Sequence, residues 1–343
     1  MSWLRSAVGT LALLALIALA PPAAAQGTAS ATADANATGA TAASALAGPD
    51  AAAQCALAEQ RGTRRSDAHE DLDALLWMQR SAEYQANTRS LYHSAARQLQ
   101  QLAQGHRNGR FSSALLDGAS TAPGTTPGTN KGPRSAIVIM DLDETVLDNS
   151  LLQGRLLRDA RVWDQSIWEC WIAARQAALV PGAELLFRTL AANGLRAWFI
   201  SNRQCAARSA DGESCPQKQD TLANLNRLLA ERGIDYRARG EEILMYDDSE
   251  PGSTRLWSGE KGPRRQWLAR QHDVLMLFGD DLGDFITGAR SSSAAQRAAL
   301  LAKPEVEQRW GTQWFMLPNP VYGSWTGALG NGGIDSVESF RFP

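Results

Sequence analysis

Four short apolar runs that alternate with helical stretches constrain the fold of this chain more than any other feature. Each run is continuously apolar, which is typical of strands buried on both faces of a parallel sheet. Two of the intervening stretches end in glycine, at Gly194 and Gly233, where a helix closes with a left-handed residue. The pattern predicts an α/β domain with its catalytic core over 134–320, a parallel sheet sandwiched by helices. The runs are AIVIM (136–140), RAWFI (196–200), EILMY (242–246) and VLMLF (274–278).

Polar side chains follow three of these four runs directly. Because the carboxyl ends of parallel strands meet at one edge of the sheet, we expect these side chains to lie together. The residues concerned are Asp141 and Asp143 after the first run, Ser201, Asn202 and Arg203 after the second, and Asp280, Asp281 and Asp284 after the fourth.

Carboxylates gathered at one edge repel each other unless a cation lies between them. Mg²⁺ is the natural choice, because it binds one or two carboxylates together with waters and a phosphate. Ser201 and Lys261 could hold an anionic substrate, one aspartate could attack phosphorus, and its neighbour two residues on could transfer the proton. Each feature alone has a plainer interpretation: an acidic turn, a loop with a glycine hinge, a surface lysine. Their order along the chain, each after an apolar strand, favours the catalytic interpretation.

The N-terminal fifth of the chain differs in composition from the rest. Residues 1–25 combine Arg5, an apolar core and a small-residue cleavage site after Ala25, which predicts a signal peptide. The alternative is a transmembrane anchor, but Pro21 and Pro22 cut the apolar run short of the roughly 20 residues that span a bilayer. Residues 26–66 form an Ala/Thr-rich leader that we expect to be disordered. Export to the periplasm or the medium follows from this interpretation.

Helical periodicity returns after the leader. Asp67 and Glu70 have the spacing of a capping box, and the apolar spacing behind them predicts one long helix over 68–103. A segment rich in proline, glycine and threonine follows, and 107–134 is predicted to be a linker.

Four cysteines are too few for a disulfide-built scaffold, but an exported chain can oxidise them. Cys205 and Cys215 flank a short polar loop and are the preferred pair; closing that loop stabilises by about 3 kcal/mol in the chain-entropy model. Cys55 would then pair with Cys170. A metal site at these cysteines is disfavoured, because their spacing is not CxxC and no histidine is near.

Composition excludes several classes of function. The 343 residues carry 34 Lys and Arg against 36 Asp and Glu, a net charge of −2, so nothing favours a nucleic-acid polymer or an anionic membrane as partner. The hydrophobic share of 44% excludes wholesale disorder.

Taken together, the motifs resemble the haloacid dehalogenase (HAD) superfamily of phosphotransferases, and within it the bacterial class C acid phosphatases and 5′-nucleotidase lipoproteins of subfamily IIIB. The resemblance covers 68–343 apart from 107–134, and implies a Rossmann-like sheet with an N-terminal helical segment and a small cap, over a domain of residues 67–343. The matching segments are DLDETVLDNS, WECWIAARQAALVPGA, KGPRRQ, GDDLGDF and LPNPVYGSW, with LLWMQRSAEYQA in the N-terminal helix.

The resemblance also implies roles for individual residues. The nucleophile falls on Asp141 and the general acid/base on Asp143. The Mg²⁺ ligands fall on Asp141, the backbone carbonyl of Asp143 and Asp280, with Asp284 in support. Phosphate binding falls on Ser201 and Lys261, with Asn202 and Arg203 shaping the loop, and substrate stacking on Trp168 and Tyr322, with Trp171 a rival of Trp168.

Three departures from the family pattern concern the substrate and the anchor. Asp281 stands where the family usually has Asn, and Leu151 and Leu152 stand where it commonly has Tyr. No lipoprotein cysteine follows the signal, which implies an exported form without a lipid anchor.

We therefore expect a Mg²⁺-dependent acid phosphatase of the periplasm or the medium. Its substrates would be small phosphomonoesters, including 5′-nucleotides, hydrolysed through an aspartyl phosphate. One alternative is a surface protein on the same fold that binds haem or a nucleotide and has little phosphatase activity. A dehalogenase or another phosphotransferase is the other. The physiological substrate, the oligomeric state, including a homodimer, and the roles of the leader and linker stay open at this point.

Overall fold

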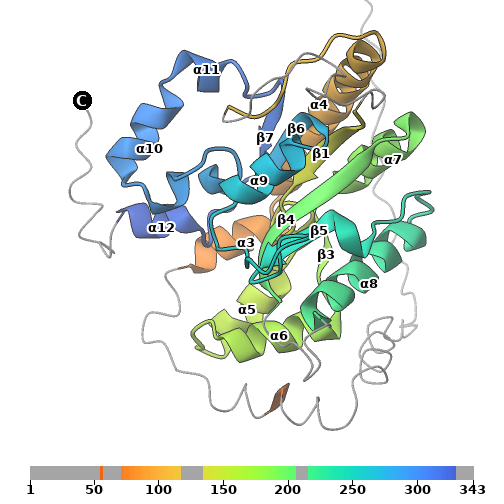
Figure 1. The fold of residues 1–343 in the computed structure, drawn as a ribbon. Helices are drawn as coiled ribbons and strands as arrows, with labels where there is room; N and C mark the ends of the chain where they lie inside the picture. The colour runs from red at the N-terminus through yellow and green to blue at the C-terminus, as the bar shows by residue number, and fades with distance from the viewer. Residues whose placement is uncertain (1–54, 57–70, 117–133, 206–214, 330–343) are drawn as a thin grey trace, which may run out of the picture. The chain divides into compact units, whose positions relative to one another are not determined.

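The computed structural model describes residues 55–56, 71–116, 134–205 and 215–329, all within one compact unit, residues 42–343. A five-stranded sheet in the order β5-β4-β1-β6-β7 forms its centre (Figure 1), and every pair of neighbouring strands is parallel. This confirms the predicted α/β class. The strands are β1 (Ala136–Met140), β4 (Arg196–Gln204), β5 (Ile243–Tyr246), β6 (Asp273–Gly279) and β7 (Trp314–Met316).

The four predicted strands form at the predicted positions, with two differences. β4 continues to Gln204, so that the polar residues 201–203 belong to the strand itself. β7 was not predicted, because a strand of three residues is too short to show a period.

Each face of the sheet has its own hydrophobic core, because successive side chains of a strand point to opposite faces. Val138 and Met140 of β1 belong to one core, whereas Ile137 and Ile139 belong to the other. Helices α4 (Ala82–Arg107), α7 (Ala183–Asn193) and α8 (Pro216–Glu231) contribute to the first core, and α9 (Gly262–Ala269) to the second. The sheet is therefore covered on both faces, as its apolar runs predict.

The helix predicted over 68–103 is two helices, α3 (Leu72–Arg80) and α4, separated at Ser81. Ser81 has an extended backbone and its Oγ accepts a hydrogen bond from the Tyr84 amide at 2.9 Å, so it caps α4. The predicted capping box at Asp67 and Glu70 lies outside the described residues.

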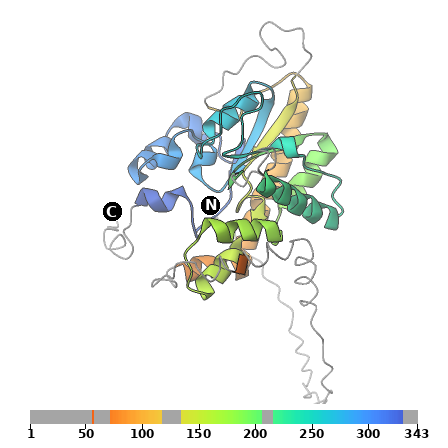
Figure 2. The ribbon, with the colours of Figure 1, turned by 60° about the horizontal axis from the view of Figure 1, so that its bottom comes forward.

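A small cap connects β1 to α7. It contains α5 (Ser150–Arg158) and α6 (Gln165–Ala174), flanked by the antiparallel pair β2 (Leu147–Asp148) and β3 (Ala178–Leu179). Figures 1 and 2 show α5 and α6 beyond the carboxyl ends of the central strands. The remaining elements are α10 (Ala294–Leu301), α11 (Pro304–Glu307) and α12 (Ser324–Leu329), with short 3₁₀ turns η1 (Gly240–Glu242), η2 (Leu282–Asp284) and η3 (Ala289–Ser291).

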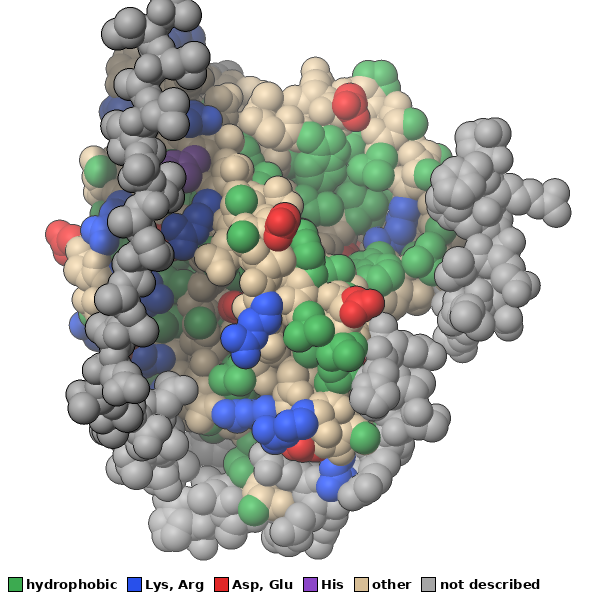
Figure 3. Space-filling model, turned by 180° about the vertical axis from the view of Figure 1, so that it is seen from behind, with side chains coloured by type: hydrophobic (Ala, Val, Ile, Leu, Met, Phe, Trp, Pro, Cys, Tyr) green, Lys and Arg blue, Asp and Glu red, His purple; other side chains and the backbone are tan. Residues whose placement is uncertain are grey.

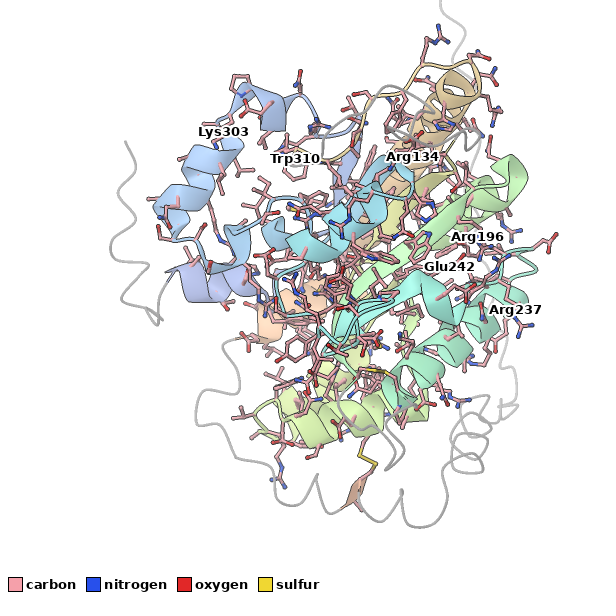
Figure 4. The ribbon with its side chains drawn as sticks, viewed as in Figure 1. Arg134, Arg196, Arg237, Glu242, Lys303 and Trp310 are labelled. Carbon is pink, nitrogen blue, oxygen red and sulfur yellow. A yellow bond between two sulfur atoms is a disulfide. The ribbon has the colours of Figure 1, made fainter. Side chains whose placement is uncertain are left out.

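Two helix ends and one edge of the sheet show the local features that stabilise them. Gly194 and Gly233 have φ values of 64° and 60°, which are the left-handed helix ends that the sequence predicts. At the edge of the sheet the guanidinium of Arg196 donates to both carboxylate oxygens of Glu242, at 2.5 and 2.6 Å (Figure 4).

The first part of the predicted linker is packed rather than free. Ala114 is fully buried, its amide donates to the Val274 carbonyl at 2.9 Å, and its carbonyl accepts from Trp314 Nε1 at 2.7 Å. Residues 117–133 of that segment lie outside the described part.

Two disulfides are present. Cys205 pairs with Cys215 and Cys55 pairs with Cys170 of α6 (Figure 4), which confirms the expected pairing. Within the described ranges, no helix combines the length and the apolar character that crossing a membrane needs.

Candidate active site

A cavity of about 820 Å³ opens at the carboxyl ends of β1, β4 and β6. Asp141, Asp143, Lys261, Asp280 and Asp284 all line it, so the structure brings together groups that the sequence places after separate strands. The cap closes one side of the cavity through Trp163 and Trp168, and Tyr322 lies at its wall from the C-terminal part of the chain.

Three carboxylates form a cluster in this cavity. One carboxylate oxygen each of Asp141, Asp280 and Asp284 lies within 4.8 Å of the others. The Lys261 ammonium, which is nearly buried, donates to Asp141 Oδ1 and to Asp284 Oδ1, both at 2.5 Å. One ammonium against three ionised carboxylates leaves two negative charges. Oxygen donors with that net charge fit a hard divalent cation.

The electrostatics of the cluster follow from burial and from the mutual repulsion of its acids. Burial raises the pKa of Asp141 to about 7; Lys261 opposes the shift, and Asp284 and Asp143 add to it. Burial, with Asp141 and Asp284, also raises the pKa of Asp280 well above its ordinary value, although a hydrogen bond from Asn319 opposes this. Burial lowers the pKa of Lys261, but Asp141 and Asp284 outweigh it and raise that pKa to about 12. Positive charge is therefore what the cluster needs in order to ionise fully.

The Asp143 carboxylate is fixed by two donors. The Arg203 guanidinium donates to it from Nε at 3.0 Å and from a terminal nitrogen at 2.7 Å, and Asn149 Nδ2 donates to Asp143 Oδ1 at 2.9 Å. Arg203 itself is buried and also donates to Thr221 Oγ1 at 2.7 Å. The side chain of Arg203 thus supports Asp143, beyond the loop-shaping role that the resemblance implied.

Ser201 and Asn202 differ in their access to the cavity. Ser201 is fully buried and its Oγ accepts from the Arg203 amide at 3.0 Å, whereas Asn202 lines the cavity and donates to the Gly259 carbonyl at 3.0 Å. Both are tied to Arg264, whose guanidinium donates to the Ser201 carbonyl at 2.7 Å and to Asn202 Oδ1 at 2.6 Å. Asn202 is therefore the member of this pair that reaches the cavity surface.

The aromatic side chains that were expected to stack on a substrate differ in their access to the cavity. Both tryptophans are buried, but only Trp168 lines the cavity, with the Arg203 guanidinium 5.5 Å from its ring. Trp171 instead donates to Asn149 Oδ1 at 2.8 Å. Tyr322 lines the cavity and its hydroxyl donates to Glu144. This placement favours Trp168 over Trp171 as the substrate-facing tryptophan.

The positions that depart from the family pattern are also defined. Asp281 accepts hydrogen bonds from the Ser324 amide at 2.7 Å, the Ser324 hydroxyl at 2.6 Å and the Gly283 amide at 2.9 Å. Burial raises the pKa of Asp281, but these bonds outweigh it and lower the pKa below its ordinary value. Leu152 is buried, and Trp163, which is half exposed, presents an aromatic ring to the cavity from the same cap.

Sequence reasoning missed several supporting residues. Asn319 donates to Asp280 Oδ2 at 2.8 Å, and Arg264 is completely buried behind Ser201. Glu144 is completely buried beside Asp143 and bonds both Asn149 and Tyr322. All three stand within the quoted motifs, LPNPVYGSW, KGPRRQ and DLDET, and polar residues in such motifs were the available signal.

A second cavity, of about 1140 Å³, adjoins the first and shares Asp280 and Asp281 with it. Its lining is largely apolar, including Trp310, Phe315 and Pro318, and Figure 3 shows hydrophobic side chains gathered in a hollow on this side of the molecule. It offers few donors to a phosphate, so the first cavity is the candidate site.

Comparison with known proteins agrees with this geometry. A family model described as HAD superfamily, subfamily IIIB (acid phosphatase), matches residues 65–325. Among solved structures, the class C acid phosphatase from Bacillus anthracis is 23% identical with a TM-score of 0.57, over 80% of this chain and 99% of that one. The same enzyme with tungstate bound is 24% identical with a TM-score of 0.57, over 81% of this chain and 98% of that one. At such identities the structural likeness establishes a shared fold.

Proposed function

The chain belongs to subfamily IIIB of the HAD superfamily, the acid phosphatases, and from this premise we propose that it hydrolyses small phosphomonoesters with Mg²⁺ through an aspartyl phosphate on Asp141. The enzyme class, a phosphoric monoester hydrolase, follows from the family. The metal, the residue roles, the substrate and the compartment are our proposal. The convergence of Asp141, Asp143, Lys261 and Asp280 on one cavity is the observation that carries it.

Asp141 acts as the nucleophile. A carboxylate oxygen of Asp141 forms a bond to phosphorus as the bond from phosphorus to the leaving oxygen breaks. Asp143, held by Arg203 and Asn149, delivers a proton to that oxygen so that it departs as an alcohol. Asp143 then takes a proton from water as the water attacks phosphorus, which releases phosphate and restores Asp141.

Positive charge is supplied from two directions. Lys261, fixed between Asp141 and Asp284, offers an ammonium to the phosphoryl oxygens. Asp141, the Asp143 carbonyl and Asp280, with Asp284 in support, would hold Mg²⁺, which would supply the positive charge that lets Asp141 ionise and would offset the charge of the phosphate. The class C acid phosphatase from Bacillus anthracis has been solved with tungstate, an oxyanion, bound, which is consistent with the proposal that this chain binds a phosphate.

The aromatic walls suit a flat leaving group. Trp168 and Tyr322 line the cavity beyond the carboxylates, and a base or phenyl ring stacked on such side chains contributes about 1–3 kcal/mol. We propose 5′-nucleotides and aryl phosphates among the substrates on this ground. We propose a mildly acidic working range, in keeping with the acid phosphatase family to which the chain belongs.

We propose that the protein is exported. Residues 1–25 have the pattern of a signal peptide, and the two disulfides suit an oxidising compartment. Mass spectrometry of the secreted or periplasmic protein should give a chain that begins at Gln26. A chain that retains residues 1–25 would contradict export by cleavage.

The phosphatase proposal is tested with Asp141→Asn and with a chelator. Asp141→Asn should abolish release of phosphate from p-nitrophenyl phosphate and from 5′-AMP, because the amide is a poor nucleophile. Asp235→Asn, at an exposed residue outside the cavity lining, is the matched control. EDTA should silence the wild-type protein and Mg²⁺ should restore it. Full activity of Asp141→Asn would contradict the role of Asp141 as nucleophile. Full activity of the wild-type protein in EDTA would contradict the metal requirement.

A further inference from the structure

The C-terminal strap, residues 317–324, is tied to the acids of the site. Asn319 Nδ2 donates to Asp280 Oδ2 at 2.8 Å, and the Ser324 amide donates to Asp281 Oδ2 at 2.7 Å. These two anchors stand on either side of Tyr322. The path of the strap past the cavity is therefore held independently of the Tyr322 side chain.

Tyr322 makes a third tie, to a residue that has no place in the mechanism above. Its hydroxyl donates to Glu144 Oε2, and Glu144 is completely buried, outside the cavity lining. Glu144 also accepts from the Asn149 amide at 2.8 Å and from Asn149 Nδ2 at 3.2 Å. Its backbone is left-handed, with φ of 55°, which is uncommon for a residue with a side chain.

Asn149 connects this arrangement to the reacting groups. Its Nδ2 donates to Asp143 Oδ1 at 2.9 Å as well as to Glu144, and its Oδ1 accepts from the buried Trp171. The side chains of Tyr322, Glu144, Asn149 and Asp143 thus form one continuous chain of hydrogen bonds. Tyr322, which lines the cavity, and Asp143, the proposed proton donor, are therefore both connected to Glu144 and Asn149.

We propose that Glu144 is a positioning residue for substrate selection: by engaging the Tyr322 hydroxyl it holds the ring as a wall of the cavity, so that Tyr322 contributes a face and not a hydrogen bond to the substrate. The inference rests on the proposed phosphatase function and deepens it, because it identifies Glu144 as the residue that keeps the Tyr322 ring in place beside a flat leaving group. Stacking on one aromatic side chain is worth roughly 5- to 150-fold in affinity. Removing the hydrogen bond between Tyr322 and Glu144 should therefore lose part of this gain in affinity.

The test compares phenyl phosphate with glycerol 2-phosphate, which has no ring. In Tyr322→Phe, which removes only the hydroxyl, the ratio of kcat/KM for the two esters should fall about tenfold from the wild-type ratio, through KM for phenyl phosphate. Glu144→Gln keeps an acceptor oxygen for Tyr322 and should lower the ratio less than Tyr322→Phe does. Tyr84→Phe is the matched control, because the buried Tyr84 hydroxyl has no hydrogen-bond partner among the described residues.

The outcomes separate selection from general structure. An unchanged ratio in Tyr322→Phe, or an equal rise in KM for both esters, overturns the positioning role, even if the melting temperature falls. If wild-type protein hydrolyses neither ester with Mg²⁺ present, the proposed function fails and this inference falls with it. A ratio that falls while glycerol 2-phosphate is still hydrolysed supports both.

Discussion

Replacing Lys261 with methionine tests the charge balance of the site most directly. Lys261 is the ammonium that bonds both Asp141 and Asp284, and its side chain is only 10% exposed. Methionine fills a similar volume, so the change removes the charge and leaves the packing. Breaking a buried ion pair destabilises a protein by about 3–5 kcal/mol. At about 2–4 °C per kcal/mol for a domain of this size, the metal-free protein should melt roughly 6–20 °C lower.

Activity should fall by a separate mechanism. Lys261 is proposed to stabilise the phosphoryl oxygens in the transition state, and losing one such group lowers kcat by about 10²–10³-fold. Mg²⁺ should raise the melting temperature of Lys261→Met by more than that of wild type, because three carboxylates without an ammonium attract the cation more strongly. Mg²⁺ should therefore restore stability without restoring the rate.

The assay combines thermal melting, with EDTA and with Mg²⁺, and hydrolysis of p-nitrophenyl phosphate. Lys303→Met is the control, because Lys303 is exposed and lies at the start of α11, away from the cavity (Figure 4). If Lys261→Met hydrolyses the ester within about threefold of wild type, Lys261 does not act on the phosphate. If its metal-free melting temperature is unchanged, the charge balance described above is wrong.

Three further predictions concern the acids, the cysteines and one glycine. In EDTA the free energy of unfolding should fall as the pH rises from about 4 to about 7. The reason is that burial raises the pKa of Asp141 from 3.8 to about 7 in the folded state, so the folded protein binds the proton more tightly than the unfolded chain. Denaturant titrations that show a rise in the unfolding free energy over this range would contradict the prediction. Reduction of Cys55–Cys170, or its replacement by two serines, should lower the unfolding free energy by about 2–5 kcal/mol in the same titration. Gly279→Ala would place a Cβ 2.3 Å from the Cβ of Asp284, so the Asp284 side chain must move. We expect kcat/KM for p-nitrophenyl phosphate to fall about 100-fold. A wild-type kcat/KM would show that the position of Asp284 does not matter for the reaction.

The parts of the fold that follow local periodicity could be predicted from the sequence. β1 forms over the predicted residues 136–140, because strands buried on both faces read as unbroken apolar runs. The break at Ser81 was missed, since the apolar spacing continues across it while the serine side chain caps the next helix. β7 was missed because it is short and owes its position to pairing with β6.

The same distinction holds for the candidate site. Asp141 and Asp280 were predictable because each directly follows an apolar strand, and parallel strands end at a common edge. The partnership of Glu144 with Tyr322 was not, because the two residues are 178 positions apart and meet only through packing. The same is true of Arg264, whose buried guanidinium holds the Ser201 carbonyl 63 positions away.

The strap also determines when during synthesis the site can be completed. Asp141, the proposed nucleophile, and Tyr322, which lines the cavity, are separated by 322 − 141 = 181 residues. At about 5–20 residues per second, a ribosome needs roughly 9–36 seconds to pass from the first to the second. During that interval the nascent chain carries Asp141 without the contacts of Asn319 and Tyr322 to Asp280 and Glu144. A nascent chain must therefore extend past Tyr322 before it can form the complete cavity, and shorter nascent chains lack that wall.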